Sequence, residues 1–150
     1  WVKLACVRQL QDLERATSGE WPWIFDADKA ARPCEFIELL PHIKGKWARE
    51  RRLIELEPWQ SFIISTVFGW VHRDTGLRRF MEVYEEIARK NAKSTKGSGL
   101  LLFMLAADGE HGAEVEAAAA GGTDELTGDG VDEVGLLAGT LHPLAAGVVL

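Results

Sequence analysis

The chain has 150 residues, of which 47% are hydrophobic and 27% charged, and this balance argues against disordered or collagen-like sequence. It contains no charge-free run of about 18 apolar residues and no basic-apolar leader, so we expect neither a membrane span nor secretion, and a cytoplasmic location. Two cysteines, Cys6 and Cys34, cannot build a disulfide framework and are expected to be buried thiols, and four scattered histidines lack zinc-ligand spacing.

The net charge of −6 conceals an uneven distribution of charged residues. All 17 Lys and Arg lie at or before Lys96, together with 14 of the 23 acidic residues, which gives residues 1–96 a net charge of +3 and residues 97–150 a net charge of −9. Most glycines follow Lys96, and Phe103 is the only aromatic residue there. This asymmetry predicts two different kinds of sequence in one chain.

The N-terminal part, residues 1–52, is expected to be mainly helical. Apolar spacing predicts a first helix, a proline within an aromatic cluster favours an extended segment, and an aspartate suits the cap of a second helix. The predicted elements are a helix over residues 2–17, an extended segment over 21–25, and a helix from Asp26 or Asp28 to about Leu40, bent or restarted at Pro33.

A basic stretch follows between His42 and Arg52, where five Lys and Arg residues surround Trp47. Cations interleaved with an aromatic residue are typical of a surface that meets phosphates. A solvated loop anchored by one tryptophan is the alternative interpretation.

An α/β core is expected to begin at about residue 53 and to run to residue 117. Pro58 at a first helical position predicts a buried helix that continues through Phe68. The turn residues Asp74-Thr75-Gly76 then predict either a hairpin or a turn that leads from residues 70–72 into a strand over residues 80–84.

The segment from Ile87 to Thr95 comes after this strand and before an apolar, helix-forming run. Strand, short loop, Lys-Ser and helix is the order of a phosphate-binding loop, in which an ammonium reaches the phosphates and a hydroxyl holds Mg²⁺. Lys93 and Ser94 suit these two roles. The consensus glycines would fall at Ile87 and Ala92, so spacing alone favours an ordinary basic helix start.

Taken together, LIELEPWQSFIISTVFGWV, TGLRRF, ARKNAKST and a helix ending in LAADGE resemble the ATPase domain of the large terminase subunit of tailed bacteriophages, from about Trp21 to Ala117. The resemblance implies an incomplete P-loop NTPase core of the α/β class, preceded by N-terminal helices. It implies the N-terminal fragment of a motor that hydrolyses ATP to package viral DNA, acting in the bacterial cytoplasm with an endonuclease elsewhere in the protein. The implied cofactors are ATP and Mg²⁺, and the implied partners are duplex viral DNA, the small terminase subunit and the capsid portal, with no membrane.

The resemblance also implies roles for individual residues. Lys93 would contact the β- and γ-phosphates, Ser94 would hold Mg²⁺, and Gln60 would contact adenine, whose N6/N7 edge complements a side-chain amide. Without the resemblance, Gln60 would be interpreted as a capping or solvent-facing residue. The implied nucleotide loop consists of Arg89, Lys90, Asn91, Ala92, Lys93, Ser94 and Thr95.

Two acidic pairs bear on this site. Glu85 and Glu86 precede the loop and would repel phosphate unless they point away. A P-loop ATPase also needs a second strand that ends in an acidic pair, and Asp132-Glu133 is the one candidate. Because glycines rather than an apolar strand precede this pair, we expect surface acids and assign no catalytic residue.

The last part, residues 118–150, is a Gly/Ala-rich acidic tail without Lys, Arg or aromatic residues. Such composition predicts a weakly structured tail or a sequence in a non-native frame, and a genuine divergent insertion is the alternative. Two alternatives to an active terminase fragment therefore stay open: a truncated or frame-shifted non-enzymatic remnant, and an unrelated helicase-like P-loop ATPase.

Overall fold

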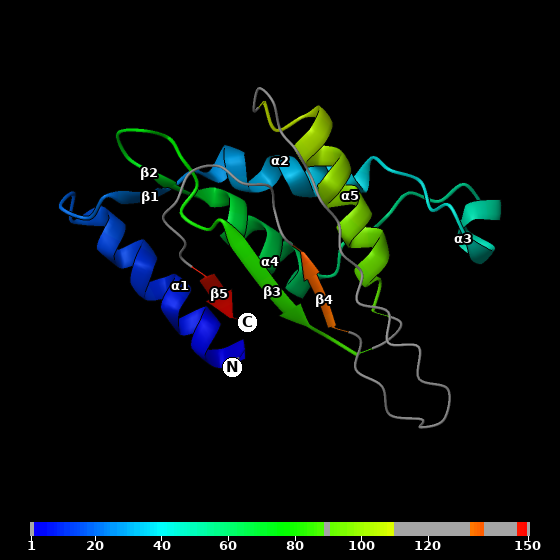
Figure 1. Cartoon of the computed structure of the whole chain (residues 1–150), viewed down its shortest axis with the longest axis horizontal. Helices are drawn as coiled ribbons and strands as arrows, with labels where there is room; N and C mark the ends of the chain where they lie inside the picture. Colours follow the sequence, from blue (N-terminus) through cyan, green and yellow to red (C-terminus); the bar gives the residue numbers. More distant parts are fainter. Residues whose placement is uncertain (1, 89–90, 110–132, 137–146, 150) are drawn as a thin grey trace. The chain divides into compact units, whose positions relative to one another are not determined.

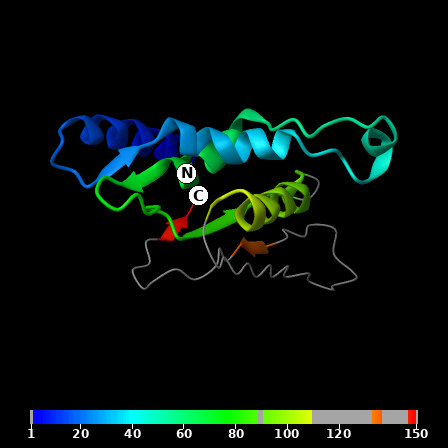
Figure 2. The same cartoon turned by 90° about the horizontal axis from the view of Figure 1, so that it is seen from above.

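The computed structural model describes residues 2–88, 91–109, 133–136 and 147–149. The chain divides into two compact units, one formed by residues 7–79 and the other by residues 1–6 with 80–150. The border thus falls between Arg79 and Phe80, whereas the sequence-based division placed one between residues 52 and 53. Figures 1 and 2 give two views of the elements, and each unit is described by itself.

The unit of residues 7–79 contains the helices and the extended segment that the sequence predicts. Asp26 caps the second helix, because its side chain accepts a hydrogen bond from the Lys29 backbone N–H at 3.0 Å. Pro33 lies inside this helix, which runs through it without a restart, and a bend at Pro33 stays a prediction. The elements are α1 (Val2–Thr17, of which residues 7–17 belong to this unit), β1 (Trp23–Phe25), α2 (Ala27–Glu38), α3 (Gly45–Arg49), α4 (Pro58–Gly69) and β2 (Trp70–His72).

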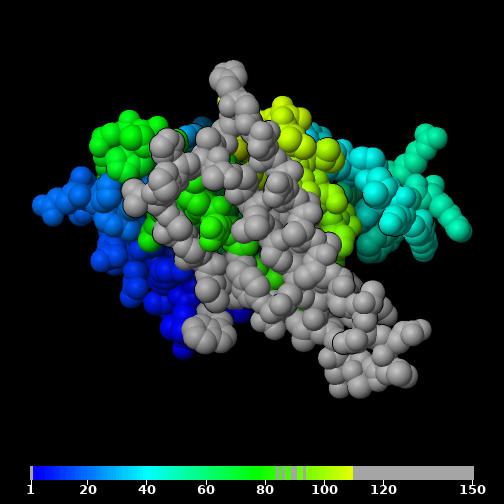
Figure 3. All heavy atoms as spheres, viewed as in Figure 1, coloured from blue at the N-terminus to red at the C-terminus, as the bar shows by residue number. Residues whose placement is uncertain are grey.

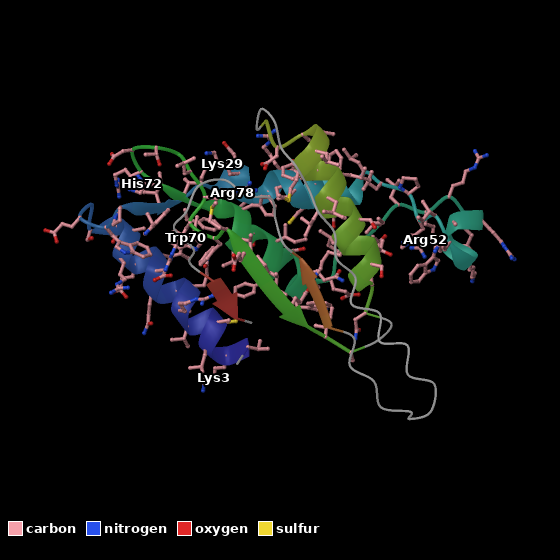
Figure 4. The ribbon with its side chains drawn as sticks, in the orientation of Figure 1. Lys3, Lys29, Arg52, Trp70, His72 and Arg78 are labelled. Atoms are coloured by element: carbon pink, nitrogen blue, oxygen red, sulfur yellow. The ribbon has the colours of Figure 1, made fainter. Side chains whose placement is uncertain are left out.

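The core of this unit lies where α2 packs against α4 beside a two-stranded antiparallel sheet. In the sheet, Phe25 of β1 stands opposite Trp70 of β2, and Trp70 is fully buried (labelled in Figure 4). Gly69 permits this packing, since a Cβ atom there would lie 2.5 Å from the Phe25 ring and 2.8 Å from the Ala30 Cβ. Other buried side chains of the core are Pro33, Ile37, Ile64, Val67, Phe68 and Val71.

Polar side chains join α1 to the rest of this unit. Asp12 is only 4% exposed and accepts a hydrogen bond of 2.6 Å from Arg79, while the Trp70 indole N–H donates to Gln9 at 2.8 Å. The Arg79 guanidinium also lies 4.8 Å from the centroid of the Trp21 ring. Burial of a charge is tolerated where the charge is paired and hydrogen-bonded, so these contacts fix the position of the helix.

The turn after β2 forms as its residues predict. The Gly76 N–H donates to the His72 carbonyl at 2.8 Å, and Gly76 has a φ of +69°, a conformation that glycine adopts without a steric penalty. The next strand, β3 (Glu82–Glu86), begins two residues later than predicted.

In the second unit, β3 is the central strand of a three-stranded sheet of order β4-β3-β5. The neighbours are β4 (Glu133–Leu136), which is antiparallel to β3, and β5 (Gly147–Val149), which is parallel to it. Both lie in the tail that was expected to be weakly structured, so this expectation is wrong for these seven positions. The physical reason is that both edges of β3 offer unpaired backbone groups, and the valine-containing segments of the tail are suited to pair with them.

Helix α5 (Lys93–Ala106) follows β3 after a short loop. Leu100, Phe103 and Met104 are buried, whereas Leu102 and Leu105 are 49% and 58% exposed. The chain is therefore mixed helix and strand, as the expected α/β class requires. Over the described part of the chain, no helix is both long enough and apolar enough to span a bilayer.

Candidate functional site

The candidate site lies at the junction between β3 and α5. Residues 87–92 connect the two elements, so the predicted order of strand, short loop and helix is present. Within the loop, the Asn91 side-chain amide donates a hydrogen bond of 3.0 Å to the Ala88 carbonyl. Arg89 and Lys90 lie outside the described residues.

Ala92 has an unusual backbone conformation at the start of α5. Its φ of 56° and ψ of 24° place it in the left-handed region, and it is the N-cap of the helix. For a residue with a Cβ atom this conformation costs about 1–2 kcal/mol, which is why glycine is preferred there. Ala92 stands where the phosphate-loop consensus has glycine, so the sequence departs from the consensus while the backbone adopts the conformation that glycine favours.

The first turn of α5 leaves backbone N–H groups without partners inside the helix. The first intrahelical bond is donated by the Lys96 N–H to the Ala92 carbonyl at 2.9 Å, so the amides of Lys93, Ser94 and Thr95 precede it. The N-cap residue Ala92 supplies no side-chain capping bond, and no acidic residue occupies the first turn. Ser94 is exposed and Thr95 half-buried. Together, amides without a partner inside the helix and the positive end of the helix dipole favour an anion.

Glu85 and Lys96 form a buried ion pair behind this turn. The Lys96 ammonium donates a hydrogen bond to the Glu85 carboxylate, and the two side chains are 5% and 16% exposed. The negative charge that was expected to oppose phosphate is thus matched by a cation in the case of Glu85. Sequence reasoning did not select Lys96, although its position one turn after Lys93, on a helix that follows an acidic strand, is a usable signal.

Gln60 belongs to the other unit and takes part in a capping box at the start of α4. Its Oε1 atom accepts a hydrogen bond of 2.9 Å from the Glu57 N–H, while the Glu57 side chain accepts from the Gln60 backbone N–H. Gln60 is 4% exposed. The capping role considered from the sequence is therefore present, and an adenine contact would have to share Oε1 with the cap or break it.

The acidic pair considered for metal binding is only half described. Asp132 lies outside the described residues, and Glu133 opens β4 instead of ending a strand. The residues that the structure describes contain no group of three His, Cys, Asp or Glu side chains that could hold a metal ion. Mg²⁺ keeps several waters and takes few protein ligands beside the phosphates of a nucleotide, and the Ser94 side chain is exposed.

Residues 58–125 match the model of the family described as terminase large subunit, ATPase domain. This range contains Gln60, the loop and α5, and it confirms the resemblance inferred from the sequence. The match begins after the expected start near Trp21 and continues past Ala117 into the tail. Comparisons with curated proteins and with solved structures gave no match.

Proposed function

We propose that this chain, which carries the sequence of a terminase large-subunit ATPase domain over residues 58–125, binds ATP with Mg²⁺ as part of a viral DNA-packaging motor. The observation that carries the proposal is the left-handed backbone of Ala92 directly before Lys93, at the junction of β3 and α5 and inside the family match. An ordinary helix start does not need a strained residue at its cap.

Different residues of the chain would bind the phosphates, the Mg²⁺ ion and the adenine base of the nucleotide. The amides at the start of α5 would donate hydrogen bonds to phosphate oxygens, and the Lys93 ammonium would neutralise the terminal phosphates. Ser94 would supply the hydroxyl that holds Mg²⁺, which screens the negative charge of the phosphates when it is bound. Arg89, Lys90, Asn91 and Thr95 would complete the loop, and Gln60 would contact adenine.

We propose binding without turnover for this chain alone. Phosphoryl transfer needs a positioned water and a carboxylate that holds the metal, and we assign neither role to a residue of this chain. In the intact protein the partners would be duplex viral DNA, the small terminase subunit and the capsid portal, in the cytoplasm of a bacterial host.

Titration calorimetry with ATP-Mg²⁺ tests the nucleotide site. Lys93→Ala should weaken binding by about 10- to 150-fold, because a hydrogen bond to a charged group contributes about 1.5–3 kcal/mol. Lys44→Ala removes an exposed lysine of the other unit and should leave the affinity unchanged. Equal affinity of the wild type and Lys93→Ala would overturn the assignment.

A further inference from the structure

The connection between α2 and α4 contains a closed loop. We call this loop the basic arm and define it as residues 42–52. Its ends are held together, because Pro41 and Leu53 form an antiparallel bridge and the His42 N–H donates to the Arg52 carbonyl at 2.9 Å. Loops whose ends lie close together in this way are compact units that often carry function. In Figures 1 and 4 the arm is the teal segment around α3, where Arg52 is labelled.

The arm has a defined internal structure although α3 has no buried residue. The Arg52 N–H donates to the Trp47 carbonyl at 3.0 Å, and the Trp47 ring lies 4.8 Å from the His42 ring between centroids. Gly45 and Arg51 have φ values of 76° and 54°, in the left-handed region. A non-glycine residue in that region costs about 1–2 kcal/mol and indicates that the surrounding contacts fix the backbone.

The charge of the arm is strongly positive, with five cations and a single acid, Glu50. Lys46 lies 3.6 Å from Glu50 and Arg52 lies 3.7 Å from Glu55, and exposed pairs of this kind contribute little to stability. The other three cations are exposed, and they form no ion pair with another described residue. They are Lys44, Arg49 and Arg51.

Exposed apolar side chains accompany these cations. Ile43 is 82% exposed and Trp47, although one side of its ring lies beside His42, is 52% exposed. In the space-filling view of Figure 3 the cyan and teal side chains of this region reach outward from the rest of their unit. Exposed apolar groups amid unmatched cations suit a partner that is itself a polyanion with less polar sugar surfaces between its charges.

We propose that the basic arm binds the phosphate backbone of duplex DNA, with Lys44, Arg49 and Arg51 as the contacting cations. The choice of duplex DNA over an acidic protein surface rests on the proposed function. Backbone contacts of this kind position a protein on DNA without reading its sequence, so the binding should be independent of base order.

Fluorescence anisotropy with a labelled duplex of about 20 base pairs, two helical turns, tests the proposal on the full chain. The triple variant Lys44→Gln, Arg49→Gln, Arg51→Gln should bind more weakly by about tenfold or more at low salt. Its log–log salt slope should be smaller by about two to three, since each phosphate contact contributes about 0.9. A second duplex of permuted sequence should bind equally well.

Two control variants separate the arm from a general effect of charge or folding. The variant Lys3→Gln, Arg8→Gln, Arg32→Gln removes the same charge outside the arm and should keep the wild-type salt slope. The variant Lys44→Arg, Arg49→Lys, Arg51→Lys keeps the charge in the arm and should bind like the wild type. Equal losses in the two glutamine variants, or wild-type binding by the arm variant, would overturn the proposal.

Competition identifies the partner, and the calorimetric test of Lys93 stays independent of it. Unlabelled duplex should displace the probe at a far lower concentration of charge than polyglutamate does. Equal displacement by polyglutamate would contradict a DNA site and favour an acidic protein. A chain that binds ATP-Mg²⁺ but no duplex refutes the arm and leaves the nucleotide site standing, whereas the reverse result refutes only the nucleotide site.

Discussion

The Lys96 ammonium donates a hydrogen bond to the Glu85 carboxylate, which joins the first turn of α5 to the strand that leads into it. Both side chains are largely buried. This pair holds the two elements on either side of the candidate loop, so the geometry of the loop depends on a contact between residues that are not themselves placed in the nucleotide site.

Removal of one member of this pair should be costly. Lys96→Met leaves the Glu85 carboxylate without its cation, and the loss of one partner of a buried ion pair typically costs about 3–5 kcal/mol. Urea denaturation should therefore show a large decrease in the free energy of unfolding, and a smaller one for the double variant Lys96→Met, Glu85→Leu. The exposed pair of Lys46 and Glu50 is a control, because Lys46→Met should cost under about 1 kcal/mol. Equal effects of Lys96→Met and Lys46→Met would contradict the account.

The strain at Ala92 should be relieved by glycine. Ala92→Gly removes a strain of about 1–2 kcal/mol from the folded state. The greater conformational freedom of glycine stabilises the unfolded chain by about 0.4–1 kcal/mol, which offsets part of this gain. We expect a net stabilisation of about 0.5–1 kcal/mol in urea denaturation. Ala88→Gly, at a neighbouring exposed position that lacks a positive φ, should destabilise the chain instead. A loss of stability in Ala92→Gly equal to that in Ala88→Gly would refute the left-handed conformation.

Sequence patterns predicted the elements whose causes are local. The helix started by Pro58, the cap at Asp26 and the turn that contains Gly76 each depend on residues within a few positions, and each is present. The order of strand, loop and helix around Lys93 was likewise predictable, because each of these elements is formed by consecutive residues with a local sequence pattern.

The features that could not be predicted from the sequence depend on contacts between residues that are far apart in the chain. Arg79 contacts Asp12 across 67 positions, and nothing local distinguishes Asp12 from other polar residues of α1. The pairing of β4 and β5 with β3 joins the tail to a strand far earlier in the chain. The composition of the tail had instead predicted little structure there. Composition measures the average of a segment, whereas strand pairing needs only a few suitable residues.

The two roles of Gln60 can be separated by substitution. Gln60→Glu keeps an acceptor for the Glu57 N–H, as a capping box allows, but it lacks the amide donor that an adenine contact needs. It should bind ATP-Mg²⁺ more weakly, with unchanged affinity for tripolyphosphate-Mg²⁺, although a buried carboxylate beside Glu57 lowers the free energy of unfolding. Gln60→Ala should also lose about 1 kcal/mol of stability with the cap. Wild-type ATP affinity in Gln60→Glu would remove the adenine assignment and leave the cap.

The two cysteines should differ in reactivity. Cys6 is exposed, which corrects the expectation that both thiols are buried, and Cys34 is half-buried. Burial raises the pKa of Cys34 from 9.0 to about 11, with Glu38 and then Glu35 adding to the shift. At a pH below both values, the thiolate fraction of Cys34 is therefore about a hundredfold lower in the folded chain than in the unfolded one.

Alkylation of single-cysteine variants measures this difference. In Cys6→Ser, the remaining Cys34 should react with iodoacetamide about a hundredfold more slowly in buffer than in concentrated urea at the same pH. In Cys34→Ser, the exposed Cys6 should react at similar rates in the two solvents. Comparable rates for folded and unfolded Cys34 at pH 8 would show that its thiol is not protected as the structure describes.

The most direct test of the nucleotide site is amide hydrogen exchange with and without ATP-Mg²⁺. In the wild type, nucleotide should slow exchange of the amides at residues 91–96, because N–H groups that bond phosphate oxygens are protected from solvent. Lys93→Ala should show little protection at the same nucleotide concentration. Protection confined to other segments, or equal protection in the wild type and Lys93→Ala, would contradict the assignment of the β3–α5 junction as the site that binds ATP.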